Sequence, residues 1–364
     1  MTRGRYRIGG VSNIHFFCKK NCTILTKCIF LFILCIRTAK NANSQSFADT
    51  YRLALMSRVE QEINNGNFHS ALEYLEMIIE MGIYNVSFEA QIYLIKSYNN
   101  YYLGRLDEAY NSILHSIEVK PDVANSHELL ALIYGDTGRY IEALEAINRA
   151  IELDGQVLSF YSNRAMLYFH GREFSNAMDD ANYVLNIEPQ HAKTLAIKAY
   201  IYMGMGNLME GFYYLDQAIS IDSGNSEFYR NRGIIHYELG NLEEAFSDLS
   251  RTIELNSKNP DVFRRRALLL ATIGQYEHAL DDIKTAMLLS PENSDLYDVR
   301  AAIYIEMGNI EAGLADILEM IKLRGADEFV EFQAFLNNLD IKSIDKNQIW
   351  DLLMPFADQF LKWK

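Results

Sequence analysis

Cysteine is absent from nearly the whole chain. The 364 residues contain four cysteines, and all of them lie within the first 35 positions, at Cys18, Cys22, Cys28 and Cys35. A body without cysteine cannot be held by a disulfide framework or carry a zinc site built on thiolates. Proline is also scarce, with 5 residues, and no stretch alternates apolar and polar residues as a half-buried strand does. The sequence therefore predicts an all-α fold.

Catalytic motifs are missing as well. None of the short patterns typical of activated serines, phosphate-binding loops, dinucleotide-binding loops or zinc proteases occurs. The 8 histidines are scattered, and none stands at metal-ligand spacing from a second histidine or an acid. We therefore expect no enzyme, no metal site, no cofactor and no small-molecule substrate.

Acidic residues are missing from residues 1–44, which hold eight lysines and arginines. The formal net charge of the chain is −14, so the rest of the chain carries −22 once these eight cations are removed. Because such a body repels phosphate backbones, nucleic-acid binding is not expected.

The cationic leader contains an apolar run at residues 28–36, followed by polar residues and by Ala42-Asn43-Ser44 as a candidate cleavage site. This order is typical of a secretory signal peptide. We expect residues 1–44 to be a signal peptide or membrane-targeting leader, and the body to lie in the secretory lumen, in the periplasm or outside the cell. The run is about half of the roughly 20 residues that span a bilayer. An uncleaved membrane anchor is the first alternative and a mitochondrial presequence the second. Asn85 begins an Asn-Val-Ser triplet, a possible glycosylation site.

One pattern returns every 34 residues from residue 124 onward. Each repeat has a small residue at a first position, namely Ala131, Ala165, Ala199, Gly233, Ala267 and Ala301. It has another at a second position, namely Ala143, Ala177, Gly211, Ala245, Ala279 and Gly313. This spacing predicts a hairpin of two closely crossing helices, because a larger side chain at either contact would push the backbones apart. A glycine between the two positions lets the first helix end in a left-handed turn. In the repeat from residue 158 this glycine comes one place earlier, at Gly171.

These features resemble the tetratricopeptide repeat family, whose unit is a 34-residue helix-turn-helix. The resemblance implies a right-handed superhelical solenoid of about eight units. Two degenerate units occupy residues 52–123, and six consecutive units occupy residues 124–327. The period then breaks, and residues 328–364 are expected to form capping helices over the last repeat. A partner-binding helix anchored by Trp350, Leu353 and Phe356 is the alternative.

A cation recurs at one position of the first helix, at Arg164, Lys198, Arg232, Arg266 and Arg300. An aspartate follows sixteen residues after each arginine, at Asp180, Asp248, Asp282 and Asp316, whereas the repeat with Lys198 has none. We interpret this column as ion pairs within the hairpins and not as a ladder for an acidic ligand. The interpretation predicts an Arg–Asp contact at salt-bridge distance in each of the four hairpins.

The resemblance also implies that the first helices line a concave groove in which a partner binds. The residues we place there are Asn163, Lys193, Tyr200, Arg230, Asn231, Arg264 and Arg265. Asn163 and Asn231 stand in contexts similar to those of co-chaperones that clamp a C-terminal carboxylate, but neither clamp is complete. Arg230, Asn231, Arg264 and Arg265 form a local basic cluster, for which an acidic peptide is the expected ligand.

The leading function is a non-catalytic scaffold that binds a protein or peptide in this groove. A lumenal or exported chaperone-like holder of unfolded clients is the alternative. A substrate-adaptor subunit of an enzyme complex is a third possibility.

Overall fold

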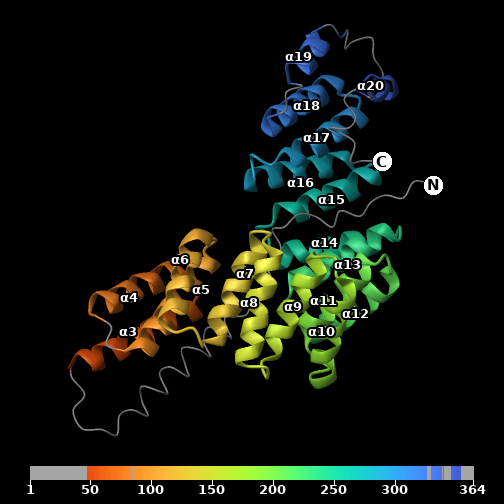
Figure 1. The fold of residues 1–364 in the computed structure, drawn as a ribbon. Coiled ribbons are helices and arrows are strands. Elements are labelled where there is room, and N and C mark those ends of the chain that lie inside the picture. Colours follow the sequence, from red (N-terminus) through yellow and green to blue (C-terminus); the bar gives the residue numbers. More distant parts are fainter. Residues whose placement is uncertain (1–46, 83–84, 326–328, 338, 340–345, 354–364) are drawn as a thin grey trace. The chain divides into compact units, whose positions relative to one another are not determined.

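The computed structural model describes residues 47–353 except 83–84, 326–328, 338 and 340–345, and every regular element within these ranges is a helix (Figure 1). Sixteen of the helices form eight hairpins, each made of a first and a second helix. The first helices are α3 (Phe47–Asn64), α5 (Val86–Tyr102), α7 (Ala124–Asp136), α9 (Leu158–His170), α11 (Ala192–Gly204), α13 (Ser226–Glu238), α15 (Pro260–Thr272) and α17 (Ser294–Glu306). The second helices are α4 (Phe68–Glu80), α6 (Leu106–Val119), α8 (Tyr140–Leu153), α10 (Phe174–Ile187), α12 (Leu208–Ile221), α14 (Leu242–Leu255), α16 (Tyr276–Leu289) and α18 (Ile310–Arg324). The prediction of an all-α array of about eight hairpins is confirmed over the described residues.

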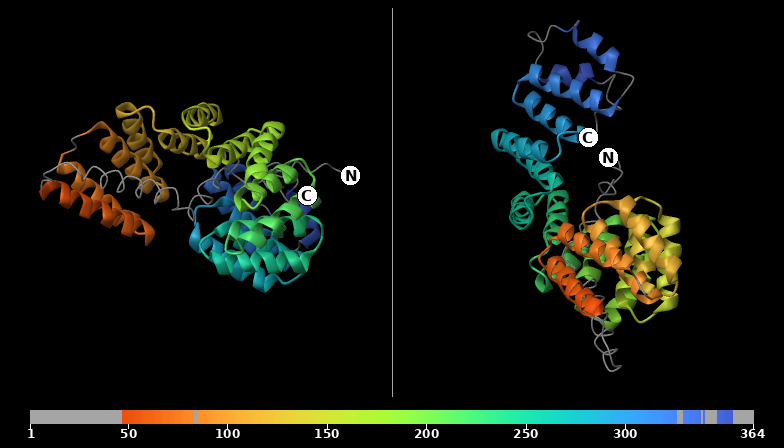
Figure 2. Two further views of the ribbon diagram at one scale, coloured as in Figure 1. Left: turned by 90° about the horizontal axis from the view of Figure 1, so that it is seen from below. Right: turned by 90° about the vertical axis from the view of Figure 1, so that its left-hand side faces the viewer.

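The described chain divides into two compact units, an N-terminal unit that ends at Gly211 and a C-terminal unit that begins at Phe212. Within each unit successive hairpins lie side by side, as two further views also show (Figure 2). Neighbouring first helices contact each other as well, α7 with α9 and α9 with α11 in the N-terminal unit, and α15 with α17 in the C-terminal unit. Each unit therefore presents one face that is built from consecutive first helices.

The small residues lie where the two helices of a hairpin cross. The first-position alanines, from Ala131 to Ala301, are buried. In the last hairpin even a methyl group does not fit at the second position. A Cβ atom on Gly313 would lie 2.6 Å from Ile305 Cγ1 and 3.0 Å from the carbonyl oxygen of Ala301. The period thus reflects the close approach of two backbones, as the spacing predicted.

Three consecutive first helices of the C-terminal unit begin in the same way. The side chains of Asn225, Asn259 and Asn293 accept hydrogen bonds from the backbone N–H groups two residues further on, at 3.1, 3.0 and 3.0 Å. Each residue whose N–H is capped is acidic, namely Glu227, Asp261 and Asp295. A carboxylate in the first turn of a helix is favoured by the positive end of the helix dipole. The caps therefore place one acid at the same position of each helix.

The turn after α9 departs from the sequence interpretation. Gly138 and Gly206 take the left-handed conformation, with φ of +76° and +84°. Gly171 does not, since its φ is −71°, and Arg172 takes the left-handed conformation instead, with φ of +62°. Arg172 lies 34 residues from both Gly138 and Gly206, so the register of the turn does not shift with the glycine. The 34-residue spacing of the helices therefore fixes which residue of the turn is left-handed. Here that residue is Arg172, for which the Cβ atom makes this conformation unfavourable.

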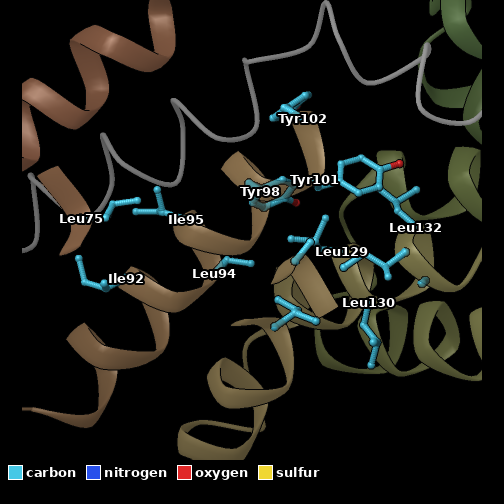
Figure 3. Close-up of a cluster of buried hydrophobic side chains, with 14 of the residues drawn as sticks. Leu75, Ile92, Leu94, Ile95, Tyr98, Tyr101, Tyr102, Leu129, Leu130 and Leu132 are labelled. Carbon is cyan, nitrogen blue, oxygen red and sulfur yellow. The ribbon is translucent and has the colours of Figure 1, made fainter. Parts of the chain in front are cut away.

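Each of the two units has hydrophobic cores of its own. In the N-terminal unit Leu75, Ile95, Tyr98 and Leu129 gather from α4, α5 and α7 (Figure 3). In the C-terminal unit one cluster joins α15, α16 and α17. Another core joins α17 and α18 to α19 (Phe329–Asn337) and α20 (Lys346–Leu353).

Over the described residues, the two terminal helices pack against the last hairpin. Phe332, Ile349 and Leu353 are buried together with Ile317 and Ile321 of α18. Leu353 was also an anchor of the alternative partner-binding helix, but it is only 3% exposed. The other two anchors, the side chain of Trp350 and Phe356, lie outside the described residues.

Candidate functional site

The four predicted Arg–Asp contacts are present in the structure. Nε and Nη2 of Arg164 lie 2.7 and 2.8 Å from the two carboxylate oxygens of Asp180. The same bidentate geometry recurs, at 2.6–2.8 Å, for Arg232 with Asp248, Arg266 with Asp282 and Arg300 with Asp316. The aspartates are buried, and two parallel charge-assisted hydrogen bonds fix the guanidinium plane. These arginines therefore join the two helices of their own hairpin.

The remaining nitrogen of the arginine reaches back to the preceding second helix, a contact that the sequence analysis did not anticipate. Arg164 Nη1 donates to Asn148 at 2.8 Å, and Arg232 Nη1 donates to Asp216 at 2.8 Å. Lys198, which has no aspartate of its own, makes the corresponding contact with Asn182 at 2.7 Å. Each acceptor stands sixteen residues before its cation. The column thus ties neighbouring hairpins together, as well as the helices within a hairpin.

In the N-terminal unit, polar side chains of four consecutive first helices meet at Glu128 of α7. Asn163 Nδ2 and Ser159 Oγ of α9 donate to Glu128 Oε1 at 2.8 and 3.3 Å, and the Tyr98 hydroxyl of α5 donates to Oε2 at 3.4 Å. Lys193 Nζ of α11 donates to Asn163 Oδ1 at 2.7 Å. We call these five residues the Glu128 network. Burial raises the pKa of Glu128 to about 6, although the charge of Lys193 and the three hydrogen bonds oppose the shift.

Two of the residues that the sequence analysis placed on a binding surface are closed off in this unit. Asn163 is 6% exposed and Tyr200 is 7% exposed. The side-chain amide of Asn163 donates to Glu128 and accepts from Lys193. The ring centroid of Tyr200 lies 6.5 Å from that of Phe169. Glu128, the centre of the network, was not anticipated. Its repeat position could have placed it on the same face, because Glu128 stands at the same repeat position as Arg230 and Arg264.

In the C-terminal unit the predicted basic cluster contains two acids that the sequence interpretation did not include. Arg230 of α13 is buried and holds Glu227 Oε2 through Nε at 2.8 Å and Nη2 at 2.7 Å. Arg264 and Arg265 of α15 hold the two oxygens of Asp261 at 2.6 and 2.7 Å. Arg230 Nη1 lies 3.7 Å from the same aspartate. Glu227 and Asp261 are the residues whose N–H groups are capped at the starts of α13 and α15.

Arginines surround Asp261 in this cluster. Burial alone would raise the pKa of Asp261, but the charges of Arg265, Arg264 and Arg230 outweigh it and hold the pKa below its usual range. Arg230 and Asn231 are buried, whereas the side chains of Arg264 and Arg265 remain 23% and 24% exposed.

Arg264 and Arg265 line a hollow of about 300 Å³ between α13, α15 and α17, which we call the α13–α17 hollow. Its apolar lining is Ile234, Leu249, Leu268 and Val299, and its charged lining is Glu238, Arg264, Arg265, Asp295 and Asp298. Tyr237, at its edge, is 38% exposed. The hollow therefore combines an apolar floor with charges of both signs, on the face that the first helices form.

The remaining sequence expectations concern the leader, the glycosylation triplet, membrane spans and metal sites. The leader, residues 1–44, lies outside the described residues. Asn85 is exposed, and its side-chain oxygen caps α5 by accepting the Phe88 N–H at 2.7 Å. Among the described helices none combines the length and the apolar character needed to cross a bilayer. No group of three or more potential metal ligands occurs within the described ranges.

Comparison with known proteins gives one family match and several similar folds. Residues 124–157 match the family model of the tetratricopeptide repeat. A chain of the APC/C hetero-tetramer Cut9–Hcn1 is similar with a TM-score of 0.61 and 13% identity, over 77% of this chain and 55% of that chain. The chain thus spans little more than half the length of that relative. No match was found among curated protein sequences.

Two further solved structures are similar at lower scores. One is a tetratricopeptide repeat protein from Parabacteroides merdae, with a TM-score of 0.48 and 22% identity over 69% of this chain and 99% of that chain. The other is Pseudomonas aeruginosa pilF, with a TM-score of 0.49 and 18% identity over 58% of this chain and 96% of that chain.

Consecutive helix hairpins that pack against their neighbours within each unit are typical of an α-solenoid. The match at residues 124–157 and the small-residue period of 34 specify the kind of repeat. Residues 124–157 are thus a tetratricopeptide repeat, and the hairpins after it follow the same 34-residue period in an α-solenoid fold similar to that of the Cut9–Hcn1 chain.

Proposed function

We propose that this protein is a non-catalytic scaffold that binds a peptide segment of another protein in the α13–α17 hollow. The observation that carries the proposal is the pair Arg264 and Arg265, which stay partly exposed above an apolar floor. Guanidinium groups next to apolar contacts are typical of energetically important positions in protein interfaces. Elsewhere on the first helices, the cations of the Arg–Asp column are engaged with buried aspartates.

A displayed library of random peptides, selected on the immobilised full-length chain, tests the proposal without a known partner. The dissociation constants of the selected peptides are then measured for the wild type and for the double variant Arg264→Gln/Arg265→Gln. We expect the double variant to weaken binding about tenfold or more, which corresponds to about 1.4 kcal/mol. Arg251→Gln is the matched control, because Arg251 is exposed and also pairs with a carboxylate three residues away on its own helix, Glu254.

The outcomes separate the possible functions. Selected peptides that bind the wild type and lose affinity only in the double variant support the hollow as the site. Peptides of unrelated sequence that bind equally well to all variants would instead favour the chaperone-like holder. Circular dichroism of each variant shows whether the fold is intact, so that lost binding is not mistaken for unfolding.

We also propose that the body of the protein is exported, on the basis of the cationic and apolar order of residues 1–44. Protease protection of a chain with a C-terminal tag tests this directly in a cell that expresses it. Protection of the tag and body by a membrane supports export, and digestion from the cytosolic side overturns it.

A further inference from the structure

Each arginine of the Arg–Asp column binds its aspartate and also lies over an aromatic ring. Arg232 holds Asp248, and its guanidinium carbon lies 5.6 Å from the centre of the Tyr229 ring. The same combination recurs at 5.4–5.7 Å in the other three hairpins, for Arg164 with Tyr161, Arg266 with Phe246 and Arg300 with Tyr297. A carboxylate bound at the edge of a guanidinium leaves its flat faces available, and an aromatic ring is attracted to such a face.

Arg264 and Arg265 have the carboxylate but not the ring. Both bind Asp261, Arg264 through Nη2 at 2.6 Å and Arg265 through Nε at 2.7 Å. Among the residues that the structure describes, no aromatic ring lies over either guanidinium. The sequence gives the reason, because a tyrosine stands three residues before Arg232, whereas Asp261 itself stands three residues before Arg264. The hollow thus contains two oriented, partly exposed guanidinium groups for which the described chain supplies no ring.

The apolar floor below these arginines is suited to one large apolar side chain. Ile234, Leu249, Leu268 and Val299 come one each from α13, α14, α15 and α17. Leu249 and Val299 are buried, so the packing of four helices fixes the shape of the floor. A hollow of about 300 Å³ is at the small end of ligand sites. It therefore has room for a single anchor side chain, while the rest of the peptide lies across the rim.

Tyr237 adds an aromatic group at the edge of the same hollow. Its side chain is partly exposed, and its hydroxyl lies 3.4 Å from the hydroxyl of Thr272 on α15. This contact ties the end of α13 to α15 and holds the tyrosine in place. Aromatic rings favour contact with one another beyond the apolar area that they bury. A ring that enters the hollow can therefore pack against Tyr237 as well as against a guanidinium face.

We infer that the α13–α17 hollow binds its peptide through an aromatic anchor, with the ring on the apolar floor and its face against the guanidinium group of Arg264 or Arg265. This inference rests on the proposed function and names the ligand class for that site, a segment that carries a phenylalanine, tyrosine or tryptophan. An aliphatic anchor of the same size gains the apolar burial but not the attraction to a guanidinium face.

Peptides selected from the displayed library, synthesised with a fluorescein label, are the probes that test the inference. Each is made in three forms, with its aromatic residue kept, replaced by cyclohexylalanine or replaced by leucine. Cyclohexylalanine keeps the six-membered ring and its apolar surface but has no π system. Fluorescence polarisation with the full-length chain gives the dissociation constants. We expect the cyclohexylalanine form to bind about fivefold more weakly than the aromatic form, and the smaller leucine about tenfold more weakly.

Variants assign this preference to the two arginines. In Arg264→Gln/Arg265→Gln the aromatic and cyclohexylalanine forms should bind equally well within about twofold, because the guanidinium faces are gone. Arg251→Gln, the matched control, should keep the full preference. An NMR spectrum of the arginine Nε–H groups adds a direct readout. The signal that Arg265→Gln removes should move upfield when the aromatic form is added, and not with the cyclohexylalanine form. A melting curve for each variant verifies the fold.

Some results would overturn the inference. Equal affinity of the aromatic and cyclohexylalanine forms contradicts the ring contact, as does a preference that survives in the double arginine variant. If the selected peptides depend on Arg264 and Arg265 but need no aromatic residue, the inference fails while the proposed function stands. If no selected peptide depends on these arginines, both fail. Self-association of the free chain in sedimentation, lost in the double variant, would show that a second copy fills the hollow and would contradict both.

Discussion

The same repeat positions build a closed polar network in the N-terminal unit and a partly open one in the C-terminal unit. Glu128 is buried and accepts hydrogen bonds from the neighbouring helices, with its pKa raised to about 6. Asp261 instead sits among three arginines, with its pKa below the usual range, and the outer two arginines remain partly exposed. The Glu128 network is enclosed by the neighbouring first helices, whereas Arg264 and Arg265 keep part of their side chains at the surface. Position in the repeat therefore does not decide whether a polar residue is structural or available to a partner.

The Arg–Asp column offers the largest expected contrast between the units. Arg164 has one carboxylate partner, Asp180, and a neutral one, Asn148, whereas Arg232 has two carboxylates, Asp248 and Asp216. Removing one partner of a buried ion pair costs about 3–5 kcal/mol. We expect Asp180→Ala to lower the free energy of unfolding by about 4 kcal/mol and Asp248→Ala by about 2 kcal/mol, because Arg232 keeps a carboxylate.

Urea unfolding followed by circular dichroism measures both variants, and amide hydrogen exchange shows which hairpin opens. Asp179→Ala is the control, since Asp179 is the exposed neighbour of Asp180 and its loss should cost less than about 0.5 kcal/mol. Equal losses for the two buried aspartates would show that the second carboxylate of Arg232 contributes nothing.

A matched pair of asparagines tests the closed network against the open one. Asn163 and Asn231 occupy the same repeat position, and both are buried. Asn163 joins Glu128 to Lys193, whereas Asn231 Nδ2 donates to the carbonyl oxygen of Glu227 on its own helix, at 2.8 Å. Asn163→Leu leaves a buried carboxylate short of a donor, and we expect a loss of about 3 kcal/mol. Asn231→Leu should cost about 1 kcal/mol. Urea unfolding of the two variants gives the comparison, and similar losses would mean that the Glu128 network is not held by Asn163.

The pH dependence of stability should differ in sign between the two acids. The folded pKa of Glu128 is about 6 against an ordinary value of 4.5, so the folded state binds more protons than the unfolded state between these values. Stability therefore falls as pH rises from about 4.5 to 6 and stays reduced above that. Glu128→Gln should remove this slope and raise the free energy of unfolding at pH 7.5 by about 2 kcal/mol, since 1.36 kcal/mol corresponds to one pKa unit.

Asp261 provides the opposite sign as a control. Its folded pKa is lowered, so its contribution to stability is present above its ordinary value and is lost as pH falls below it. Asp261→Asn should destabilise the C-terminal unit at pH 7.5 and have a smaller effect near pH 3. Unfolding curves at several pH values measure both variants. A Glu128→Gln variant that is less stable than the wild type at pH 7.5 would show that the ionised carboxylate is favourable where it lies.

The parts of the molecule that recur in the sequence could be predicted, and the parts that occur once could not. The hairpins follow from small residues that repeat every 34 positions, because each pair of helices makes the same close contact. The Arg–Asp contacts followed from a covariation within the chain, since the repeat with Lys198 also lacks the aspartate. Glu128, Asn163 and Lys193 stand at repeat positions that carry other residue types in other repeats, as at Arg230 and Glu227, so the period places them on the first helices but does not predict their contacts.

The candidate site was predicted in part for the same reason. Arg264 and Arg265 were placed on the binding face, but the acids that share it were not. Asp295 and Asp298 stand 34 residues after Asp261 and Arg264, so the register already put them on the next first helix. The sequence does not reveal how far each side chain is buried. Arg230 is a buried partner of Glu227, whereas the side chain of Arg264 stays partly exposed.

Arg172 allows the smallest and most local comparison of the two units. The turns after α13, α15 and α17 use Gly240, Gly274 and Gly308 in the left-handed conformation, whereas the turn after α9 uses Arg172 with φ of +62°. The left-handed conformation costs a residue with a Cβ atom about 1–2 kcal/mol of folding free energy. Replacing it by glycine removes this cost, but part of the stabilisation is lost because glycine has more conformational entropy in the unfolded chain. Arg172→Gly should therefore raise the free energy of unfolding by about 0.5–1 kcal/mol, and Gly240→Arg should lower it by about 1 kcal/mol. Thermal unfolding of the two variants and the wild type measures the difference. A destabilised Arg172→Gly variant would show that the arginine side chain makes contacts in the turn that outweigh its backbone strain.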